Sequence, residues 1–251
     1  IYPVGNESGN ESSGASIYPS TFSGSIGNLF TFSSNLYAVP STINGSAVWL
    51  YPLSTKTWNT TAAFSLNTAL RPNANAISAG GVLYLAGNNQ VFTCTPSSST
   101  TTSSSCLPDG ITTNTGTTAP GTINAMAFPN NGSNPFTGFY IGGSGGLFAE
   151  SGTTTTPLNA LNTWVPVVVE TSSNTTTPIT NSITAMTTYN NSLYAADDKG
   201  NIWYVPNDYP ESSAAPIASL VASVSGPISA IVADAIGGIL YFATTSGNSS
   251  T

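Results

Sequence analysis

Carboxylates are the side chains with which this sequence could do chemistry. Its 251 residues include ten aspartates and glutamates but no histidine, so the commonest general base and metal ligand is missing. Glycoside hydrolysis needs two carboxyl groups that face one bond. We expect only Asp234 near the centre of the fold, and one acid is not a pair. The sequence therefore predicts no catalytic residue and no enzymatic activity.

Two short motifs raise the question of metal or phosphate binding. The turn sequence DDKGN begins at Asp197 and Asp198 and could hold calcium, but its aspartates and glycine are typical of a hairpin turn, which we favour. The sequence GGSGG, from Gly142 to Gly146, has neither the lysine nor the helix of a phosphate-binding loop and favours a flexible or bulged turn. We predict neither a metal site nor a cofactor.

The two cysteines, Cys94 and Cys106, bracket a loop rich in serine and threonine. A disulfide between them would close a loop of about 13 residues and stabilise the fold by roughly 3 kcal/mol in the chain-entropy model. We predict this disulfide because the loop cannot hold its own ends together, and it indicates an oxidising compartment. Two unrelated buried thiols are the alternative.

The low charge of the chain excludes several classes of partner. Charged residues make up only 5% of the sequence, against roughly 25% in typical soluble proteins. Its three basic residues cannot neutralise a nucleic-acid backbone or bind an anionic membrane surface. No apolar run approaches the roughly 20 residues of a membrane span, so we predict no direct membrane insertion. No signal peptide is recognisable, and an exported protein would be seen here in its processed form.

A repeated strand pattern organises the chain. An apolar residue, a tyrosine and then small or apolar residues occur five times, around Tyr37, Tyr84, Tyr140, Tyr194 and Tyr241. Another apolar strand precedes most of these tyrosine strands, and a turn and further strands follow most of them. Four short strands in a unit of about 50 residues are typical of a β-propeller blade. The tyrosine strands are apolar at consecutive positions, which predicts burial on both faces between adjacent blades.

We therefore predict an all-β fold: a five-bladed β-propeller with four-stranded antiparallel blades, forming a single domain over residues 1–251. The predicted blades cover about residues 24–70, 71–118, 119–178, 179–224, and 225–251 together with 1–23. Tandem β-sandwiches are the main alternative, but they explain the repeated tyrosine strand less well.

The N-terminus is predicted to close the ring. The fifth unit reaches Thr251 directly after its tyrosine strand, without its third and fourth strands. Residues 1–4 (IYPV) resemble the third strands WLYP and WYVP of other units, and residues 17–23 directly precede the first unit. We predict that these two segments complete the last blade and remove its open edge. Donation of the same strands to a neighbouring molecule is the alternative.

Eight asparagines lie in Asn-x-Ser/Thr sequons. A composition so rich in asparagine, serine and threonine produces sequons by chance, but most of these fall in predicted loops, where glycans can be accommodated. We therefore predict covalent N-glycans. The candidate sites are Asn6, Asn10, Asn44, Asn59, Asn131, Asn174, Asn190 and Asn248.

The overall composition resembles that of exported surface proteins from thermoacidophilic archaea and their viruses. The resemblance rests on the low charge, on 72 serines and threonines, on 25 asparagines, and on runs such as SSSTTTSSS and SGTTTTP. It covers the whole chain and contains no diagnostic motif. It implies an N-glycosylated extracellular protein of a cell or virion surface, a coat, filament, adhesin or virion component that associates with other surface subunits.

Two functional classes remain. The first is a non-catalytic structural or adhesive surface glycoprotein, which we favour because residues for catalysis and metal binding are so scarce. The second is a carbohydrate-binding, lectin-like propeller in which tryptophans stack on sugars. Three of the four tryptophans lie at equivalent places in the repeats, which favours packing between blades; the four are Trp49, Trp58, Trp164 and Trp203. A propeller glycosidase is a third and weaker alternative.

Overall fold

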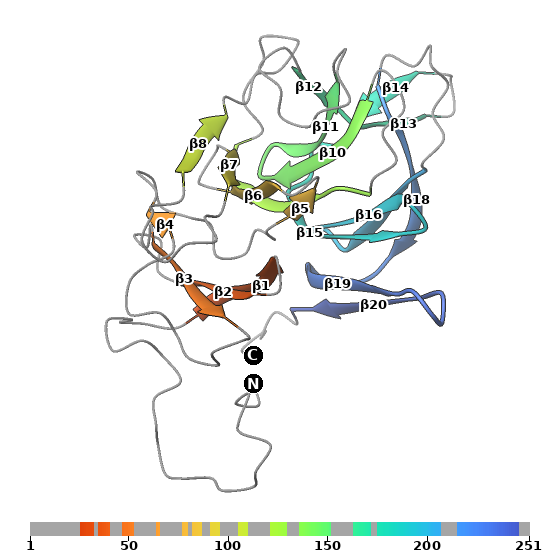
Figure 1. The fold of residues 1–251 in the computed structure, drawn as a ribbon. Helices are drawn as coiled ribbons and strands as arrows, with labels where there is room; N and C mark the ends of the chain where they lie inside the picture. Colours follow the sequence, from red (N-terminus) through yellow and green to blue (C-terminus); the bar gives the residue numbers. More distant parts are fainter. Residues whose placement is uncertain are drawn as a thin grey trace, which may run out of the picture.

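Runs of β-branched and aromatic residues, separated by glycine, proline and asparagine, form twenty β-strands in the described part of the chain. The structure, a computed structural model, describes residues 26–32, 35–40, 47–52, 64–65, 77–79, 82–86, 91–95, 105–109, 121–129, 136–151, 163–171, 175–206 and 215–245. The strands form five sheets that succeed one another clockwise in the view of Figure 1. This arrangement confirms the all-β prediction.

The first two sheets are four-stranded meanders in which each strand pairs with the next one along the chain. The first sheet consists of β1 (Ile26–Phe32), β2 (Asn35–Pro40), β3 (Ala47–Pro52) and β4 (Phe64–Ser65). The second consists of β5 (Ile77–Ala79), β6 (Val82–Ala86), β7 (Val91–Thr95) and β8 (Ser105–Asp109). The repeated tyrosine lies on the second strand of each sheet, as Tyr37 and Tyr84.

The third and fourth sheets contain the same antiparallel meander. The third consists of β9 (Ile123–Ala127), β10 (Phe136–Gly143), β11 (Gly146–Ser151) and β12 (Thr163–Pro166). The meander of the fourth consists of β15 (Ile183–Tyr189), β16 (Ser192–Asp197), β17 (Asn201–Val205) and β18 (Ile217–Ser223).

A hairpin extends the fourth sheet to six strands. The sequence predicts one irregular strand from Thr163 to Glu170, but the structure divides it at Val167. The N–H of Val167 donates to the carbonyl of Leu147 at 2.9 Å, and its own carbonyl accepts from the N–H of Ile179 at 3.0 Å. Beyond this point the chain leaves the third sheet and forms the hairpin of β13 (Val168–Glu170) and β14 (Thr176–Pro178). Strand β13 pairs in parallel with β18.

The fifth sheet has two strands among the described residues, β19 (Ile228–Asp234) and β20 (Ile239–Thr244). Tyr241, the last of the repeated tyrosines, lies on β20. The segments predicted to complete this sheet, residues 1–4 and 17–23, lie outside the described residues.

The core lies between successive sheets rather than within any one of them. Tyr84 of the second sheet packs in one buried cluster with Met126 of the third, and Tyr140 of the third packs with Met186 of the fourth. A smaller cluster joins the fourth sheet to Ile231 of the fifth. The tyrosine strands of the second, third and fourth sheets are therefore each covered on one face by the next sheet, as their consecutive apolar residues predict.

Close approach between the third and fourth sheets requires a glycine. A β-carbon at Gly142 would lie 2.5 Å from Ile183 Cγ2 and 2.5 Å from Met186 Cε, far inside van der Waals contact. Tyr140, two residues earlier on β10, contributes its side chain to the same cluster. A large side chain and an absent one thus alternate along this face, which lets the two sheets interdigitate.

The contact between the third and fourth sheets should dominate stability. Replacement of the buried Met186 by alanine leaves a cavity in the largest cluster and should lower the free energy of unfolding by about 2–5 kcal/mol. Thr188→Ala, at an exposed position of the same strand, is the matched control and should change it by less than about 0.5 kcal/mol. Urea denaturation followed by tryptophan fluorescence measures both, and equal effects of the two substitutions would contradict this account of the core.

Candidate functional site

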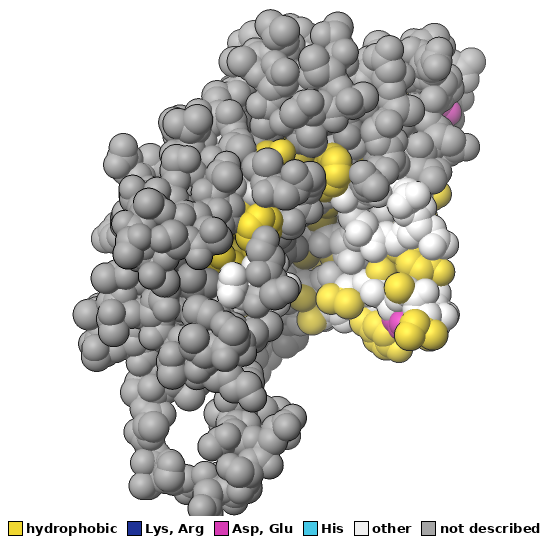
Figure 2. Space-filling model, viewed as in Figure 1, with side chains coloured by type: hydrophobic (Ala, Val, Ile, Leu, Met, Phe, Trp, Pro, Cys, Tyr) yellow, Lys and Arg dark blue, Asp and Glu magenta, His cyan; other side chains and the backbone are white. Residues whose placement is uncertain are grey.

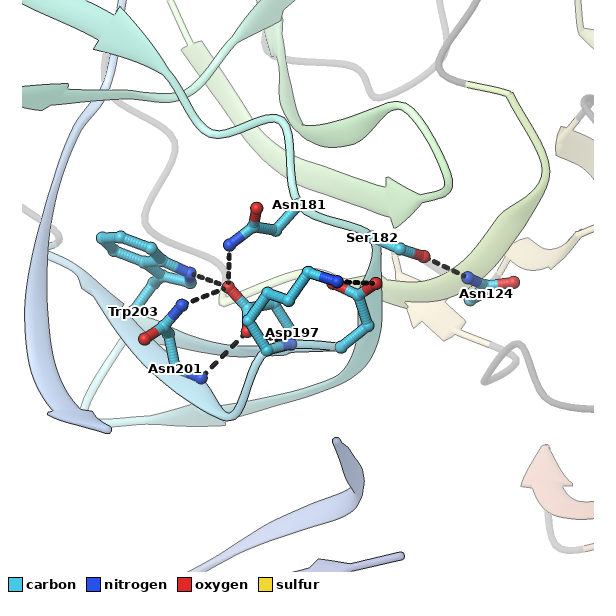
Figure 3. Close-up of polar contacts among 8 residues, drawn as sticks. Asn124, Asn181, Ser182, Asp197, Asn201 and Trp203 are labelled. Carbon is cyan, nitrogen blue, oxygen red and sulfur yellow. Dashed lines mark hydrogen bonds and ion pairs between the residues drawn. The ribbon is translucent and has the colours of Figure 1, made fainter. Parts of the chain in front are cut away.

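The most elaborate polar arrangement in the described residues surrounds the carboxylate of Asp197, which is fully buried at the end of β16. One oxygen, Oδ2, accepts hydrogen bonds from Asn181 Nδ2 at 2.8 Å, Asn201 Nδ2 at 2.9 Å and Trp203 Nε1 at 3.0 Å. The other, Oδ1, accepts from the backbone N–H groups of Lys199 and Asn201, both at 2.9 Å. Figure 3 shows the side chains of Asn181, Asn201 and Trp203 directed at this carboxylate.

These donors come from three parts of the fourth sheet. Asn181 lies two residues before β15, Lys199 lies in the turn after β16, and Asn201 and Trp203 belong to β17. The turn itself needs Gly200, whose φ of +87° is unfavourable for other residues and whose β-carbon would lie 2.1 Å from the carbonyl oxygen of Val224. The structure thus places DDKGN at the hairpin turn where the sequence predicts it, with Asp197 as the point to which the surrounding strands are bonded.

Hydrogen bonding determines the charge state of Asp197. Burial of its carboxyl group raises the pKa, but the hydrogen bonds from Asn181, Asn201 and Trp203 together lower the pKa by more. The net result is a pKa below the ordinary value of an aspartate, so the group is an anion at neutral pH. Its charge is balanced by N–H dipoles rather than by a cation.

The arrangement suits a structural role rather than a chemical one. Both oxygens already accept hydrogen bonds, and every partner around them is an N–H donor. A calcium ion needs oxygen ligands, and N–H groups that point inwards would repel it. A general acid must hold a proton near neutral pH, which a lowered pKa opposes. The calcium interpretation of Asp197 and Asp198 is therefore unfavourable on the geometry of the turn.

Asp234, the acid expected near the centre of the fold, lies at the end of β19. Its Oδ1 accepts a hydrogen bond from the N–H of Ile236 at 2.9 Å, and its backbone carbonyl accepts from the N–H of Gly238 at 3.0 Å. Like Asp197, it holds a hairpin turn together. Its carboxylate and that of Asp197 belong to different sheets, and the structure assembles no group of three or more potential metal-ligating side chains among the residues it describes.

The other described carboxylates are spread over the fold. Asp198 forms an ion pair with Lys199 across 3.5 Å, and both side chains are partly or largely exposed. Glu150 is buried within β11 opposite Trp164, and Glu170 is exposed at the end of β13. Of Asp109 only the backbone, in β8, is described. The remaining carboxylates, Glu7, Glu11, Asp208 and Glu211, lie outside the described residues.

Of the eight predicted glycosylation sites, Asn190 is the one within the described residues. It is exposed in the two-residue turn between β15 and β16, so a glycan would extend into solvent. Asn190 and Asn191 have φ values of 48° and 58°, which asparagine tolerates better than most residues. The turn therefore supplies a structural reason for an asparagine here, independent of glycosylation.

The two cysteines occupy paired positions on neighbouring strands. Strand β7 pairs with β8 so that Cys94 lies directly opposite Cys106. Opposed residues in an antiparallel pair have Cα separations within the range that a disulfide spans. The backbone register therefore suits the predicted bond, which remains a prediction.

Both described tryptophan side chains are engaged in packing. Trp164 is buried and contacts the ring of Phe139 edge-on, with ring centroids 5.9 Å apart. Trp203 packs against the cluster between the third and fourth sheets and donates its indole N–H to Asp197. Trp164 therefore has no free ring face on which a sugar could stack, whereas Trp203 is partly buried. In the described part of the chain no helix is long and apolar enough to cross a membrane.

Comparison with known proteins extends the description of the fold. No family model matches the chain, and no curated protein matches it significantly. Among solved structures it is similar to PorZ, a bacterial surface component of the type-IX secretion system of Porphyromonas gingivalis, with a TM-score of 0.62 and 19% identity over 96% of this chain. It is also similar to the extracellular domain of the one-component system BT4673 from B. thetaiotaomicron, with a TM-score of 0.57 and 15% identity over 90% of this chain.

A third similar structure consists of the WD40 repeats of RRP9, with a TM-score of 0.50 and 12% identity over 82% of this chain. WD40 repeats form propeller blades of four strands. The fold is of the β-propeller type. The chain spans only 33% of the PorZ chain, 27% of the BT4673 chain and 56% of the RRP9 chain. At these identities the likeness concerns the fold alone.

Sequence reasoning recognised the turn at Asp197 but missed the site around it. The partners Asn181 and Trp203 lie 16 residues before and six residues after the aspartate, and only the folded sheet brings them together. A signal was nevertheless present. Asp197 directly continues the apolar strand SLYAA, whereas the residue three positions after each of the other repeated tyrosines is uncharged. A lone acid at the end of a buried strand indicates a carboxylate with dedicated donors.

Substitution of Asp197 by asparagine should destabilise the fourth sheet strongly. The amide would turn an NH₂ group towards buried N–H donors, at a cost of about 3 kcal/mol in the free energy of unfolding. Asp198→Asn, which removes only a surface ion pair, is the matched control and should cost less than about 1 kcal/mol.

The effect of Asp197 should also depend on pH. Because its pKa is lowered on folding, its stabilisation is complete above the unfolded-state pKa of about 3.9 and is lost as the pH falls through the lower folded-state pKa. The difference in unfolding free energy between wild type and Asp197→Asn should therefore be constant from pH 7 to about pH 5 and shrink below about pH 4. Denaturant titrations at several pH values measure it, and a difference that grows on acidification would contradict the assignment.

Proposed function

We propose that this chain is a non-catalytic, extracellular structural or adhesive glycoprotein of a cell or virion surface. Its partners would be other subunits of the same coat, filament or virion, and its covalent modifications N-glycans. The observation that carries the proposal is that the carboxylates serve to hold turns together. Asp197 and Asp234, the carboxylates best placed for chemistry, both bind backbone N–H groups of hairpin turns.

Three further observations support an extracellular location. One similar structure is a bacterial surface component, and another is an extracellular domain. The backbone register suits a disulfide between Cys94 and Cys106, which an oxidising compartment would maintain. Asn190, the described sequon, is exposed in a turn.

The proposal includes a ring of five blades. The first four sheets each contain a four-stranded meander, whereas β20 has no partner on its outer edge among the described strands. Residues 1–4 and 17–23 of the same chain would supply the third and fourth strands of the fifth blade. An exposed strand edge invites association with other chains, so its completion would prevent pairing of other chains with this edge.

The functional proposal is tested on native and on recombinant material. Glycopeptide mass spectrometry of the native protein should find N-glycans on several sequons, including Asn190. In recombinant protein from a glycosylating host, Asn190→Gly should remove one glycan without straining the turn, because glycine adopts its positive φ. The purified protein should hydrolyse no glycoside, ester or peptide, and Asp234→Asn should change nothing in these assays.

Three results would contradict the proposal in different ways. Sequons that are all unmodified in native material would remove the glycoprotein assignment. Hydrolysis that Asp234→Asn abolishes would show an enzyme. Specific binding on a glycan array, competed by the free sugar, would replace the structural role with the lectin-like alternative.

Ring closure is tested by deletion of residues 1–23. The truncated protein should expose the edge of β20 and therefore aggregate, or unfold at a temperature lower by about 5 °C or more, as expected for the loss of more than about 2 kcal/mol. Deletion of residues 1–4 alone should have a smaller effect of the same sign. A soluble, monomeric and equally stable truncation, by light scattering and calorimetry, is the outcome that excludes closure by these segments.

A further inference from the structure

Exposed apolar side chains are concentrated at one end of the series of sheets. In the described residues, Figure 2 shows them over the region of the last strands, and one further residue of this kind lies on β1 of the first sheet. The exposed large apolar residues are Leu29, Leu220, Val221, Val232, Ile236, Ile239, Tyr241 and Phe242. Two of them, Leu29 and Tyr241, occupy positions that are buried elsewhere in the repeat.

The interfaces between the later sheets follow one rule. The repeated tyrosine of a sheet packs towards an apolar residue on the first strand of the next sheet. Tyr84 shares a cluster with Met126, and Tyr140 with Met186. In the same way Tyr194 packs against the cluster that contains Ile231. Met126, Met186 and Ile231 are almost completely buried.

Strand register places Leu29 at the same position as these three residues. Met126 pairs with Ile141, Met186 with Ala195 and Ile231 with Phe242, in each case the residue that follows the repeated tyrosine. Leu29 pairs with Ala38, which follows Tyr37. The equivalence therefore rests on hydrogen-bonded register as well as on sequence. Leu29 is nevertheless 42% exposed.

The fifth sheet has an exposed apolar face that corresponds to the other side of such an interface. Tyr241 is 57% exposed, while Tyr37, Tyr84 and Tyr140 are buried. Val232 lies opposite Tyr241 on the same face, and it is 59% exposed. Since Tyr84, Tyr140 and Tyr194 each pack towards the next sheet, the equivalent face of β19 and β20 is directed away from the fourth sheet. The two sides of one apolar contact of this kind, Leu29 and Tyr241, thus lie on the first and the fifth sheet.

We propose that Leu29 and Tyr241 are the two sides of one further interface, here called the closing seam, which forms within a single chain when the fifth sheet packs against the first. The seam repeats the contacts Tyr84–Met126 and Tyr140–Met186. It rests on the five-bladed ring of the proposed function, but it involves the faces of the sheets, whereas residues 1–23 would complete the edge of one sheet.

Packing of the two sheets within a single chain, rather than between two molecules, is favoured for two reasons. Both halves belong to one domain, so their effective concentration exceeds that of separate molecules. The seam is also apolar, with no charged residue on β1 and only Asp234 at the end of β19. Charge therefore gives no steering towards a partner molecule. Contact between the fifth sheet of one copy and the first sheet of another would instead build an open, non-closing chain of molecules.

Cysteine accessibility tests the seam in the full chain. Leu29→Cys and Tyr241→Cys, made singly, should react with a maleimide about tenfold or more slowly than Leu220→Cys if the seam excludes the reagent except during local opening. Leu220 is the matched control because it is 53% exposed on β18 and pairs with Trp203, away from the seam. Labelling as fast as that of the control would overturn the proposal, whatever the outcome of any crosslinking.

A crosslink then shows whether the closing seam forms within one chain or between two. The double variant Leu29→Cys/Tyr241→Cys, treated with a short bismaleimide, should yield an internally crosslinked monomer, as should Tyr194→Cys/Ile231→Cys across the existing interface. Leu29→Cys/Leu220→Cys should not. Crosslinked dimers or longer species in place of the internal product would show that the seam joins separate copies and would overturn the intramolecular proposal.

The same measurements after deletion of residues 1–23 separate the two parts of the closure. Retained protection and crosslinking would support the seam while excluding a need for the N-terminal strands. Their loss in the truncated protein, with both present in the full chain, would support both. Glycopeptide analysis and hydrolysis assays do not depend on the seam, so failure of the functional proposal is recognised independently.

Discussion

The rest of this structure depends on one constraint: a tyrosine strand that is apolar at consecutive positions must be covered on both of its faces. No sheet can do this alone, since a sheet buries at most one face against itself or its loops. The chain meets the constraint by placing sheets in succession, so that Tyr84 is buried by the third sheet and Tyr140 by the fourth. The absence of a side chain at Gly142 brings two of these sheets together closely enough to exclude water.

A second consequence follows from the scarcity of charge. With three basic residues against ten acids in the whole chain, few of the acids can be balanced by ion pairs. Asp197 is instead stabilised by amide, indole and backbone N–H groups, which hold its pKa below the ordinary value. The interaction persists until the carboxylate itself is protonated, and its lowered pKa moves that protonation to lower pH. A fold built this way has few electrostatic contacts that moderate acid can break.

Much of the fold could be predicted from the repeat, whereas contacts between residues far apart in the sequence could not. The second strand of each sheet was predictable because consecutive apolar residues and flanking turn residues are local signals. These strands carry the repeated tyrosines Tyr37, Tyr84, Tyr140, Tyr194 and Tyr241. The parallel pairing of β13 with β18 was missed. Pro166 signals that a strand can end within Thr163–Glu170, because proline has no N–H to donate, but no local signal shows that the next strand pairs with β18. The donors of Asp197 were missed for a related reason: Asn181 gains its meaning only from the pairing of β15 with β16.

The strands and the stretches that carry the sequons differ in the side chains that they offer for contact with a partner. The strands of the third and fourth sheets bury most of their apolar side chains between sheets, and Asp197 and Asp234 hold hairpin turns together. All eight sequons, by contrast, lie between or beyond the described strands, seven of them outside the described residues in stretches rich in uncharged polar residues. Binding by such residues uses hydroxyl and amide groups that form many weak, salt-insensitive hydrogen bonds. On the coat or filament surface that we propose, several such weak contacts made together would gain affinity through avidity, without a single deep site.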